Sequence, residues 1–230
     1  MKVGALLVAG AFTLAGCSGG SEGGAEAAPA ESSTPTPTLA VGAEQYTADE
    51  LEAALEAVKA DKGLSGDIEN DAMLRPQLSG ALPDVTTTPD QCQKLITSAL
   101  DEGIGDGNLA AMTAGEGLLT AVSYKDSSRT EQQADTNEQM LADCAEFTME
   151  TAGMVVTGEV EGIDAQTDAP TTQGVRTTVT RDGGTAEAIQ ISALSGTLQL
   201  SITQFDPADM DAAVADAEEL INAVLAELEK

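Results

Sequence analysis

The chain has 230 residues and a formal net charge of −29, because 39 Asp and Glu residues stand against 10 Lys and Arg residues. A chain this acidic repels phosphate backbones, which argues against nucleic acid as a partner. Histidine and tryptophan are absent, which excludes histidine-dependent triads, histidine general bases and histidine metal sites. The shortage of aromatic residues also argues against sugar binding by stacking.

The first residues form a pattern typical of secretion. Lys2 precedes an almost wholly apolar run, Val3–Thr13, which is shorter than the about 20 apolar residues of a transmembrane helix. The run ends in the sequence LAGC at Leu14–Cys17, which resembles a bacterial lipobox. The resemblance implies that residues 1–16 are a lipoprotein signal peptide and that Cys17 is the mature N-terminus, lipidated with acyl chains such as palmitate. The alternative is an ordinary signal peptide in which Cys17 occurs by chance.

Residues 17–45 are predicted to be a flexible tether that begins at the lipidated cysteine. They are rich in Gly, Ser, Ala, Glu, Pro and Thr, with STPTPT at Ser33–Thr38, and such a composition cannot bury enough apolar surface to fold. A coil of this length spans roughly 30 Å, enough to hold a domain away from the extracytoplasmic face of the cell membrane. Glycosylation of the Thr/Pro stretch is left open.

Residues 46–230 are long enough for one domain with its own core. Once Cys17 is lipidated, Cys92 and Cys144 are the remaining cysteines. Outside the cytoplasm an even pair predicts a disulfide. Two thiols without histidine make a poor zinc site.

Helices are expected in several places along this domain. Thr47 and Glu50 form a capping-box pattern before an apolar stripe that ends at Gly63. A second helix start is expected at Thr88, which precedes Pro89 at the first helical position. Further expectations are a short apolar segment around Pro76, a polar helix over 128–142, and a final helix that starts at Asp206-Pro207 and carries a long apolar stripe.

Strands are expected between the helices and especially after Cys144, where the apolar period changes to two. One strand is expected at Leu118–Tyr124, and later strands are separated by turns at 181–184 and at Ser195-Gly196. The sequence therefore predicts an α+β fold, with an antiparallel sheet of about five to six strands and helices packed on one face.

The order of these segments resembles the actinobacterial envelope lipoproteins related to the extracellular sensor domain of receptor-type Ser/Thr kinases. The segments that carry the resemblance are LAGC at Leu14–Cys17, the helix opening at Thr47–Leu55, VTTTPDQC at Val85–Cys92, CAEFTMETAG at Cys144–Gly153, GTLQLSITQ at Gly196–Gln204, and the acidic last helix. The resemblance implies a sheet with helices packed on it, a cleft proposed to hold a ligand, and no known reaction. Members often carry two disulfides, and this sequence lacks the cysteines for a second one.

The sequence contains no recognisable catalytic or metal-binding motif. Ser195 lacks a histidine partner and is interpreted as a turn serine. The acidic segment Asp101–Asn108 offers oxygen ligands of the kind that Ca²⁺ prefers, but its spacing does not match an EF-hand, so a solvated loop is the simpler interpretation. The acidic last helix is likewise interpreted as a solvated face. No cofactor is expected.

The predicted function is that of a membrane-anchored lipoprotein with a sensor-like domain that binds an unknown apolar ligand or an envelope protein, without catalysis. The alternatives are a structural or interaction lipoprotein without a small ligand, and an acid-residue hydrolase. A pocket is expected against the apolar strand faces; the simpler alternative is that these residues are plain core. Its expected wall residues are Val175, Val179, Leu198, Leu200 and Ile202.

Overall fold

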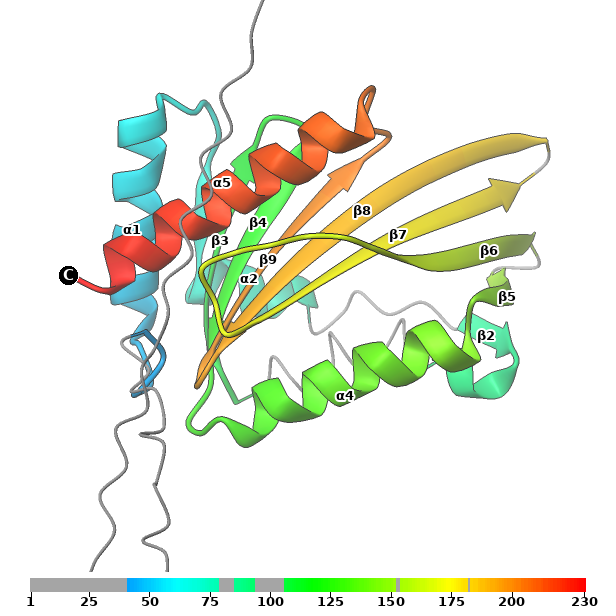
Figure 1. Ribbon diagram of the computed structural model, residues 1–230, viewed down its shortest axis with the longest axis horizontal. Coiled ribbons are helices and arrows are strands. Elements are labelled where there is room, and N and C mark those ends of the chain that lie inside the picture. Colours follow the sequence, from blue (N-terminus) through cyan, green and yellow to red (C-terminus); the bar gives the residue numbers. More distant parts are fainter. Residues whose placement is uncertain (1–40, 79–84, 94–105, 152–153, 182) are drawn as a thin grey trace, which may run out of the picture. The chain divides into compact units, whose positions relative to one another are not determined.

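The computed structural model describes residues 41–78, 85–93, 106–151, 154–181 and 183–230 (Figure 1). The expected signal peptide, Cys17 and the tether up to residue 40 lie outside the described residues. The described part is an α+β domain built around one antiparallel sheet.

The sheet has nine strands in the order β1-β3-β4-β9-β8-β7-β6-β5-β2, and every neighbouring pair is antiparallel. The strands are β1 (Ile68–Asn70), β2 (Val85–Thr88), β3 (Asn108–Ala114), β4 (Gly117–Ser123), β5 (Glu146–Thr151), β6 (Met154–Ile163), β7 (Thr171–Arg181), β8 (Gly184–Ser195) and β9 (Leu198–Phe205). The helices are α1 (Ala48–Lys62), α2 (Asp71–Leu78), α4 (Ser128–Asp143) and α5 (Met210–Leu228), with a short 3₁₀ helix, η1 (Asp90–Cys92).

The prediction of five to six strands is corrected to nine, because β1, β2 and β3 were not expected. β1 and β2 are edge strands of three and four residues, too short to show an apolar period. In β3 four consecutive residues from Leu109 to Met112 are buried, so the alternation that identifies a half-buried strand is missing.

One face of the sheet carries the main core, which α1 and α5 cover. Strand residues that point to this face include Met112, Leu119 and Ile191, and they pack with Leu55 of α1 and Ile221 of α5. All five side chains are at most 1% exposed. The close packing of small and branched side chains therefore compensates for the shortage of aromatic residues.

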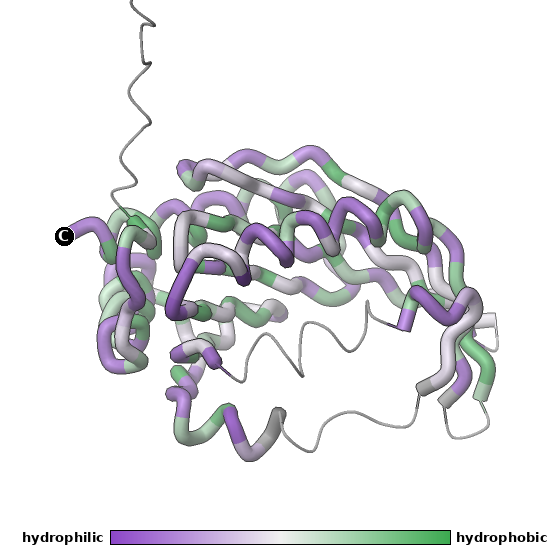
Figure 2. The backbone as a smooth tube through the Cα atoms, turned by 90° about the horizontal axis from the view of Figure 1, so that it is seen from below, coloured by the Kyte–Doolittle hydropathy of each residue, from purple (hydrophilic) through white to green (hydrophobic). Residues whose placement is uncertain are grey.

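The opposite face is covered by α4 and α2, which corrects the expectation that helices pack on one face alone. Val175 packs with Met140 near the end of α4 and pairs with Gln190 of β8. Gln190 lies between Ile189 and Ile191 along β8, and Ile191 belongs to the main core, so α4 and α5 lie on opposite faces. In Figure 2, which views the molecule from the α4 side, α4 crosses the sheet as a mainly hydrophilic helix.

Helix α1 starts and ends as the sequence predicts. The Thr47 side chain accepts a hydrogen bond from the Glu50 backbone, the Glu50 carboxylate accepts one from the Thr47 backbone, and Gly63 ends the helix in the left-handed conformation. These hydrogen bonds with Thr47 hold the pKa of Glu50 below its usual value.

Two other helix starts differ from the prediction. The last helix starts later than expected, because Asp209 and not Asp206 is its N-cap. Asp206 instead accepts a hydrogen bond from the Glu187 backbone at the end of the β8–β9 hairpin. Thr88 is the last residue of β2 and does not cap a helix. The apolar stripe expected beyond Gln93 lies outside the described residues.

Residues 41–46 hold the start of the domain against the β8–β9 turn. The Ser195 hydroxyl donates to the Val41 carbonyl oxygen over 2.6 Å, and the Thr197 hydroxyl donates to the Glu44 carbonyl oxygen over 2.8 Å. A Cβ on Gly42 would lie 1.7 Å from the Ser195 carbonyl oxygen. The last residues of the expected tether are thus part of the folded domain. Among the described helices, none is long and apolar enough to cross a membrane.

Candidate functional site

A cleft of about 210 Å³ lies on the α4 side of the sheet. Strands β5 to β9 and the end of α4 line it. The lining residues are Met140, Phe147, Val160, Val175, Thr177, Ala188, Ile189, Gln190 and Thr203. We refer to this hollow as the cleft.

Strand register brings these residues together from distant parts of the chain. Thr203 pairs with Gln190, and Gln190 pairs with Val175, so the three form one row across β9, β8 and β7. The next row joins Ala188 to Thr177, and Thr177 to Val160. Because directly paired residues share a face, both rows point toward α4. Ala188, Thr177 and Thr203 in these rows have small side chains, which leaves space between the sheet and α4.

Phe147 forms one wall of the cleft. Its ring lies across the backbone of Gly158, the residue that it pairs with on β6. A Cβ built on Gly158 would lie 2.2 Å from Cζ of Phe147, so a glycine is required for the ring to lie there.

The Cys92–Cys144 disulfide lies beside this wall. The structure joins the two sulfur atoms and places the two Cα atoms 5.7 Å apart. Both cysteines are buried and belong to one cluster with Phe147, Val160 and Val175. The disulfide therefore fixes the end of α4 and the start of β5 to η1, next to the apolar end of the cleft.

Polar side chains continue on the same sheet face beyond the apolar end. The Gln190 amide donates to the Thr203 hydroxyl over 3.5 Å. Farther along, the Ser192 and Ser201 hydroxyls are 2.9 Å apart and buried. Uncharged hydrogen-bonding groups therefore lie in and next to the cleft.

Tyr124 ends this polar row. Its hydroxyl donates to Oε1 of Gln199 over 3.2 Å. Burial raises the pKa of Tyr124 to about 12, although the nearby Arg129 lowers it in part. Tyr124 is therefore neutral at physiological pH.

Helix α4 is fixed over the cleft by hydrogen bonds of its own. The Thr130 hydroxyl donates to the Gly196 carbonyl oxygen in the β8–β9 turn over 2.6 Å. The Asn137 amide donates to Oε1 of Gln173 on β7, and the Gln173 amide donates to the Ala134 carbonyl oxygen. These contacts tie α4 to the β8–β9 turn and to β7, so the roof of the cleft is positioned by the strands that form its floor.

The cleft lining carries no charged residue, although 49 of the 230 residues of the chain are charged, from 10 basic and 39 acidic residues. Polar groups from Thr177, Gln190 and Thr203 are the hydrogen-bonding side chains among the described lining. The chemistry available there is contact with apolar surface and neutral hydrogen bonding. No acid–base pair is present among these nine residues.

The five expected wall residues do not come together. Leu198, Leu200 and Ile202 are at most 1% exposed and lie in the main core with α1 and α5. Val175 lines the cleft on the other face, and Val179 is half-buried one row beyond Thr177, where it pairs with Ala186. Leu198, Leu200 and Ile202 point to the face of β9 that α1 and α5 cover, whereas the cleft lies on the other face of the sheet.

Of the nine lining residues only Val175 was expected; the residues that sequence reasoning missed are Met140, Phe147, Val160, Thr177, Ala188, Ile189, Gln190 and Thr203. One signal was present in the sequence. Glycines at 158 and 162 lie four residues apart in one strand and so point to the same face, which indicates that something packs closely there.

No group of three or more acidic or cysteine residues is placed to hold a metal within the described ranges. Most of the acidic segment expected as a solvated loop, residues 101–105, lies outside them. Of the rest, Asp106 pairs with Arg129, and Asn108 donates to the Tyr46 carbonyl oxygen.

No protein-family model matches this sequence, and no curated protein matches it. Its structure is similar to the extracellular domain of PknH from Mycobacterium tuberculosis, with a TM-score of 0.51 and 12% identity over 80% of this chain and 97% of that one. It also matches an uncharacterized protein from Mycobacterium smegmatis, an Rv0999 ortholog, with a TM-score of 0.44 and 18% identity over 77% of this chain and 96% of that one. The first match shows a shared fold.

Proposed function

We propose that this domain, which has the fold of a receptor-kinase extracellular domain, binds an uncharged ligand with an apolar part in the cleft and does not catalyse a reaction. The observation that carries the proposal is the absence of charge from the nine lining residues in a chain with a net charge of −29. Ligand sites are typically apolar with a few well-placed polar groups, and the cleft has this composition.

The size of the cleft limits the ligand. A volume of about 210 Å³ is below the roughly 300–1,000 Å³ of typical ligand pockets. The cleft therefore holds a small ligand or one part of a larger one. Phe205 is 57% exposed and pairs with the lining residue Ala188, and Leu118 is 41% exposed and pairs with Thr203. These two side chains give a longer ligand an apolar surface on which to continue.

The chain is proposed to act at the extracytoplasmic face of a membrane, anchored by acyl chains on Cys17. The support for this is the lipobox pattern, the polar tether sequence and the disulfide, which suits an oxidising compartment. An envelope protein that receives the ligand signal is a further expected partner.

A neutral apolar dye tests the proposal. N-phenyl-1-naphthylamine should bind the purified protein with increased fluorescence, whereas the anionic dye anilinonaphthalene sulfonate should bind more weakly because the protein is acidic. Ala188→Leu fills the cleft floor and should weaken binding at least about tenfold, since its added methyl groups occupy the space of the dye. Ala226→Leu, on the exposed side of α5, adds the same atoms elsewhere and is the matched control.

Absence of dye binding, or equal effects of the two substitutions, would remove the support for a ligand in the cleft. Independently of the dye, native mass spectrometry of the protein isolated from its own envelope would reveal a bound small molecule. Neutral lipids and cell-wall precursors that bind the domain should raise its unfolding temperature. The gain in the free energy of unfolding should increase with the free ligand concentration [L] as RT ln(1 + [L]/Kd).

A further inference from the structure

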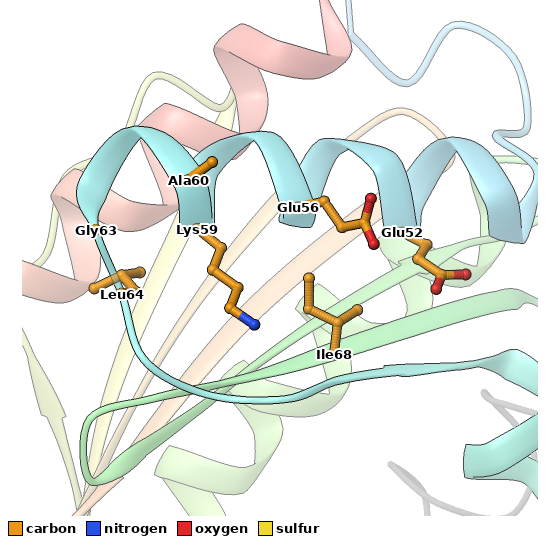
Figure 3. Close-up of a pocket in the computed structure, with 7 residues that line it drawn as sticks. All are labelled: Glu52, Glu56, Lys59, Ala60, Gly63, Leu64 and Ile68. Carbon is orange, nitrogen blue, oxygen red and sulfur yellow. The ribbon is translucent and has the colours of Figure 1, made fainter.

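The cleft has a suitable chemistry for an uncharged ligand but a small volume. Its volume of about 210 Å³ is below the roughly 300 Å³ at which typical ligand pockets begin. Two larger hollows, of about 500 and 320 Å³, have charged side chains in their lining, such as Glu52, Glu56 and Lys59 on α1 (Figure 3). An uncharged ligand of ordinary size is therefore best accommodated if the cleft itself widens, and α4 is the helix that covers it.

Most of α4 lacks an apolar face. Residues 128–139, which we call the polar part of α4, contain no apolar side chain larger than that of Ala134. Thr130 is the one buried residue of the whole helix, whereas α1 buries four of its residues and α5 five. Helices in proteins owe most of their stability to the packing of an apolar face. The core therefore holds the polar part of α4 far less firmly than it holds α1 or α5.

Hydrogen bonds hold the polar part of α4 in place. The Thr130 hydroxyl donates to the Gly196 carbonyl oxygen over 2.6 Å, and the Asn137 amide donates to Oε1 of Gln173 over 2.7 Å. The Gln173 amide donates to the Ala134 carbonyl oxygen over 3.1 Å. Each such bond contributes little net stability, because water takes the place of the partner when the bond breaks. These three bonds therefore break and re-form at a small cost.

The sheet next to these hydrogen bonds is polar as well. Gln173, Ser192 and Ser201 form one row across β7, β8 and β9 on the face that α4 covers. The two serine hydroxyls are 2.9 Å apart and bond to each other. A movement of α4 away from this row leaves the serines paired and exposes no apolar side chain of the row to water.

The other end of α4 is firmly attached. Met140 and Leu141 pack with the buried cluster that contains Phe147. Cys144, directly after the helix, is bonded to Cys92 in the same cluster. Apolar packing and a covalent bond thus act at one end of the helix, so this end is the point about which α4 turns.

The link before α4 limits how far the helix start moves. Residues 125–127 join it to Tyr124, whose backbone N–H donates to the Thr197 carbonyl oxygen over 2.8 Å. Three residues span at most about 10 Å, so the start of α4 tilts outward but does not leave the domain. The ion pair between Arg129 and Asp106, at 3.5 Å on the surface, adds little resistance to this movement.

We infer that α4 is a lid that tilts about its disulfide-bonded end and regulates access to the cleft. The inference rests on the proposed function, because it concerns the entry of the same uncharged ligand. In the closed state, which the structure shows, Thr130 and Asn137 hold the lid on the β8–β9 turn and on β7. In the open state water replaces these bonds, and the cleft extends along β8 from Gln190 toward Ser192. A ligand that binds the open state better shifts the population toward it.

Hydrogen exchange followed by mass spectrometry tests whether the lid opens. Thr130→Val keeps the shape of the side chain and removes the hydroxyl that binds the β8–β9 turn. Exchange of the backbone amides over residues 131–137 should rise roughly fivefold, the effect of losing one hydrogen bond, while exchange in α1 and α5 stays unchanged. Thr136→Val is the matched control, because its hydroxyl donates to the Gln132 carbonyl oxygen within the same helix. It should change the exchange by less than about twofold.

Dye binding separates a lid from a fixed roof. Thr130→Val should tighten binding of N-phenyl-1-naphthylamine by the same factor of roughly five, because the apparent Kd falls as the fraction of the open minor state rises. A fixed roof predicts weaker binding, since the variant loosens a wall of the cleft.

The inference is overturned if Thr130→Val weakens dye binding, if it leaves the exchange over residues 131–137 unchanged, or if it raises exchange in α1 and α5 by the same factor. Equal effects of Thr136→Val would also overturn it. If the unsubstituted protein binds no dye, the proposed function fails, and the exchange measurement still decides whether α4 opens.

Discussion

The Phe147 ring lies directly across Gly158, the residue that faces it on the neighbouring strand, and a Cβ on Gly158 would lie 2.2 Å from Cζ of the ring. The position of the ring, and with it one wall of the cleft, depends on the absence of a single carbon atom.

We predict that Gly158→Ala forces the ring out of its place. The expected result is a loss of about 1–3 kcal/mol in the free energy of unfolding, which is typical of an added methyl group in a packed site, together with weaker dye binding in the cleft. Urea unfolding measures the first effect and dye titration the second.

Gly162→Ala is the matched control. It lies on the same strand and the same face, and its Cβ would lie 3.6 Å from Cδ1 of Leu141, an ordinary contact distance. Equal losses for the two glycine substitutions would show that strand propensity, and not the Phe147 ring, sets the effect.

The disulfide is predicted to stabilise the domain substantially. Replacing Cys92 and Cys144 together by alanine opens a loop with a sequence separation of 52 residues, for which the loop-entropy estimate is roughly 4 kcal/mol. Urea unfolding without reductant should show this loss. Addition of dithiothreitol to the unsubstituted protein should shift its unfolding midpoint toward that of the double variant. If the double variant unfolds at the same urea concentration as the unsubstituted protein, the bridge does not stabilise the fold.

Alkaline pH should destabilise the domain through Tyr124. Its folded pKa of about 12 is above the value of about 10 for an exposed tyrosine. Below pH 10 both states are protonated, so the contribution of the neutral phenol is fully present. As pH rises from 10 toward 12 the unfolded state loses this proton first, and the free energy of unfolding falls.

Tyr124→Phe should therefore flatten the decline between pH 10 and 11.5 in urea unfolding followed by circular dichroism. The same substitution lowers stability at neutral pH by about 1 kcal/mol, because the hydrogen bond to Gln199 is lost. A slope equal to that of the unsubstituted protein would assign the alkaline loss to other groups.

Cys17→Ser should release the protein from the membrane fraction or leave it unprocessed, since the lipid is proposed to be attached to that sulfur. Fractionation and intact mass measure the two effects. A serine variant that stays in the membrane with the mass of the unsubstituted protein would contradict lipid anchoring.

The strands after Cys144 could be predicted from the sequence, because apolar and polar residues alternate along them and the turns after β7 and β8 contain Gly183 and Gly196. Strand β3 could not be predicted, since Leu109 to Met112 are buried on both faces. The number of strands was underestimated for this reason and because the two edge strands are too short to show a period.

The cleft was harder to predict than the strands. Strand β9 alternates Leu198, Leu200 and Ile202 with Gln199, Ser201 and Thr203, and the alternation does not reveal which face is filled by helices. In this domain the larger apolar side chains of β9 lie on the face that α1 and α5 cover, and Thr203 on the other face lines the cleft. Which of these residues lie next to one another depends on the pairing register of the strands. The sequence does not specify this register.

The hydrogen bonds from Ser195 and Thr197 to Val41 and Glu44 also determine how force enters the domain. A pull on the chain before Val41 reaches the turn between β8 and β9, which are inner strands of the nine-stranded sheet. Two strands that are hydrogen-bonded on both sides therefore bear this force. An edge strand or a helix end, which separates more easily, does not bear it. The Thr130 hydroxyl binds the same turn from the opposite side, so the helix above the cleft is attached at the point where the load arrives.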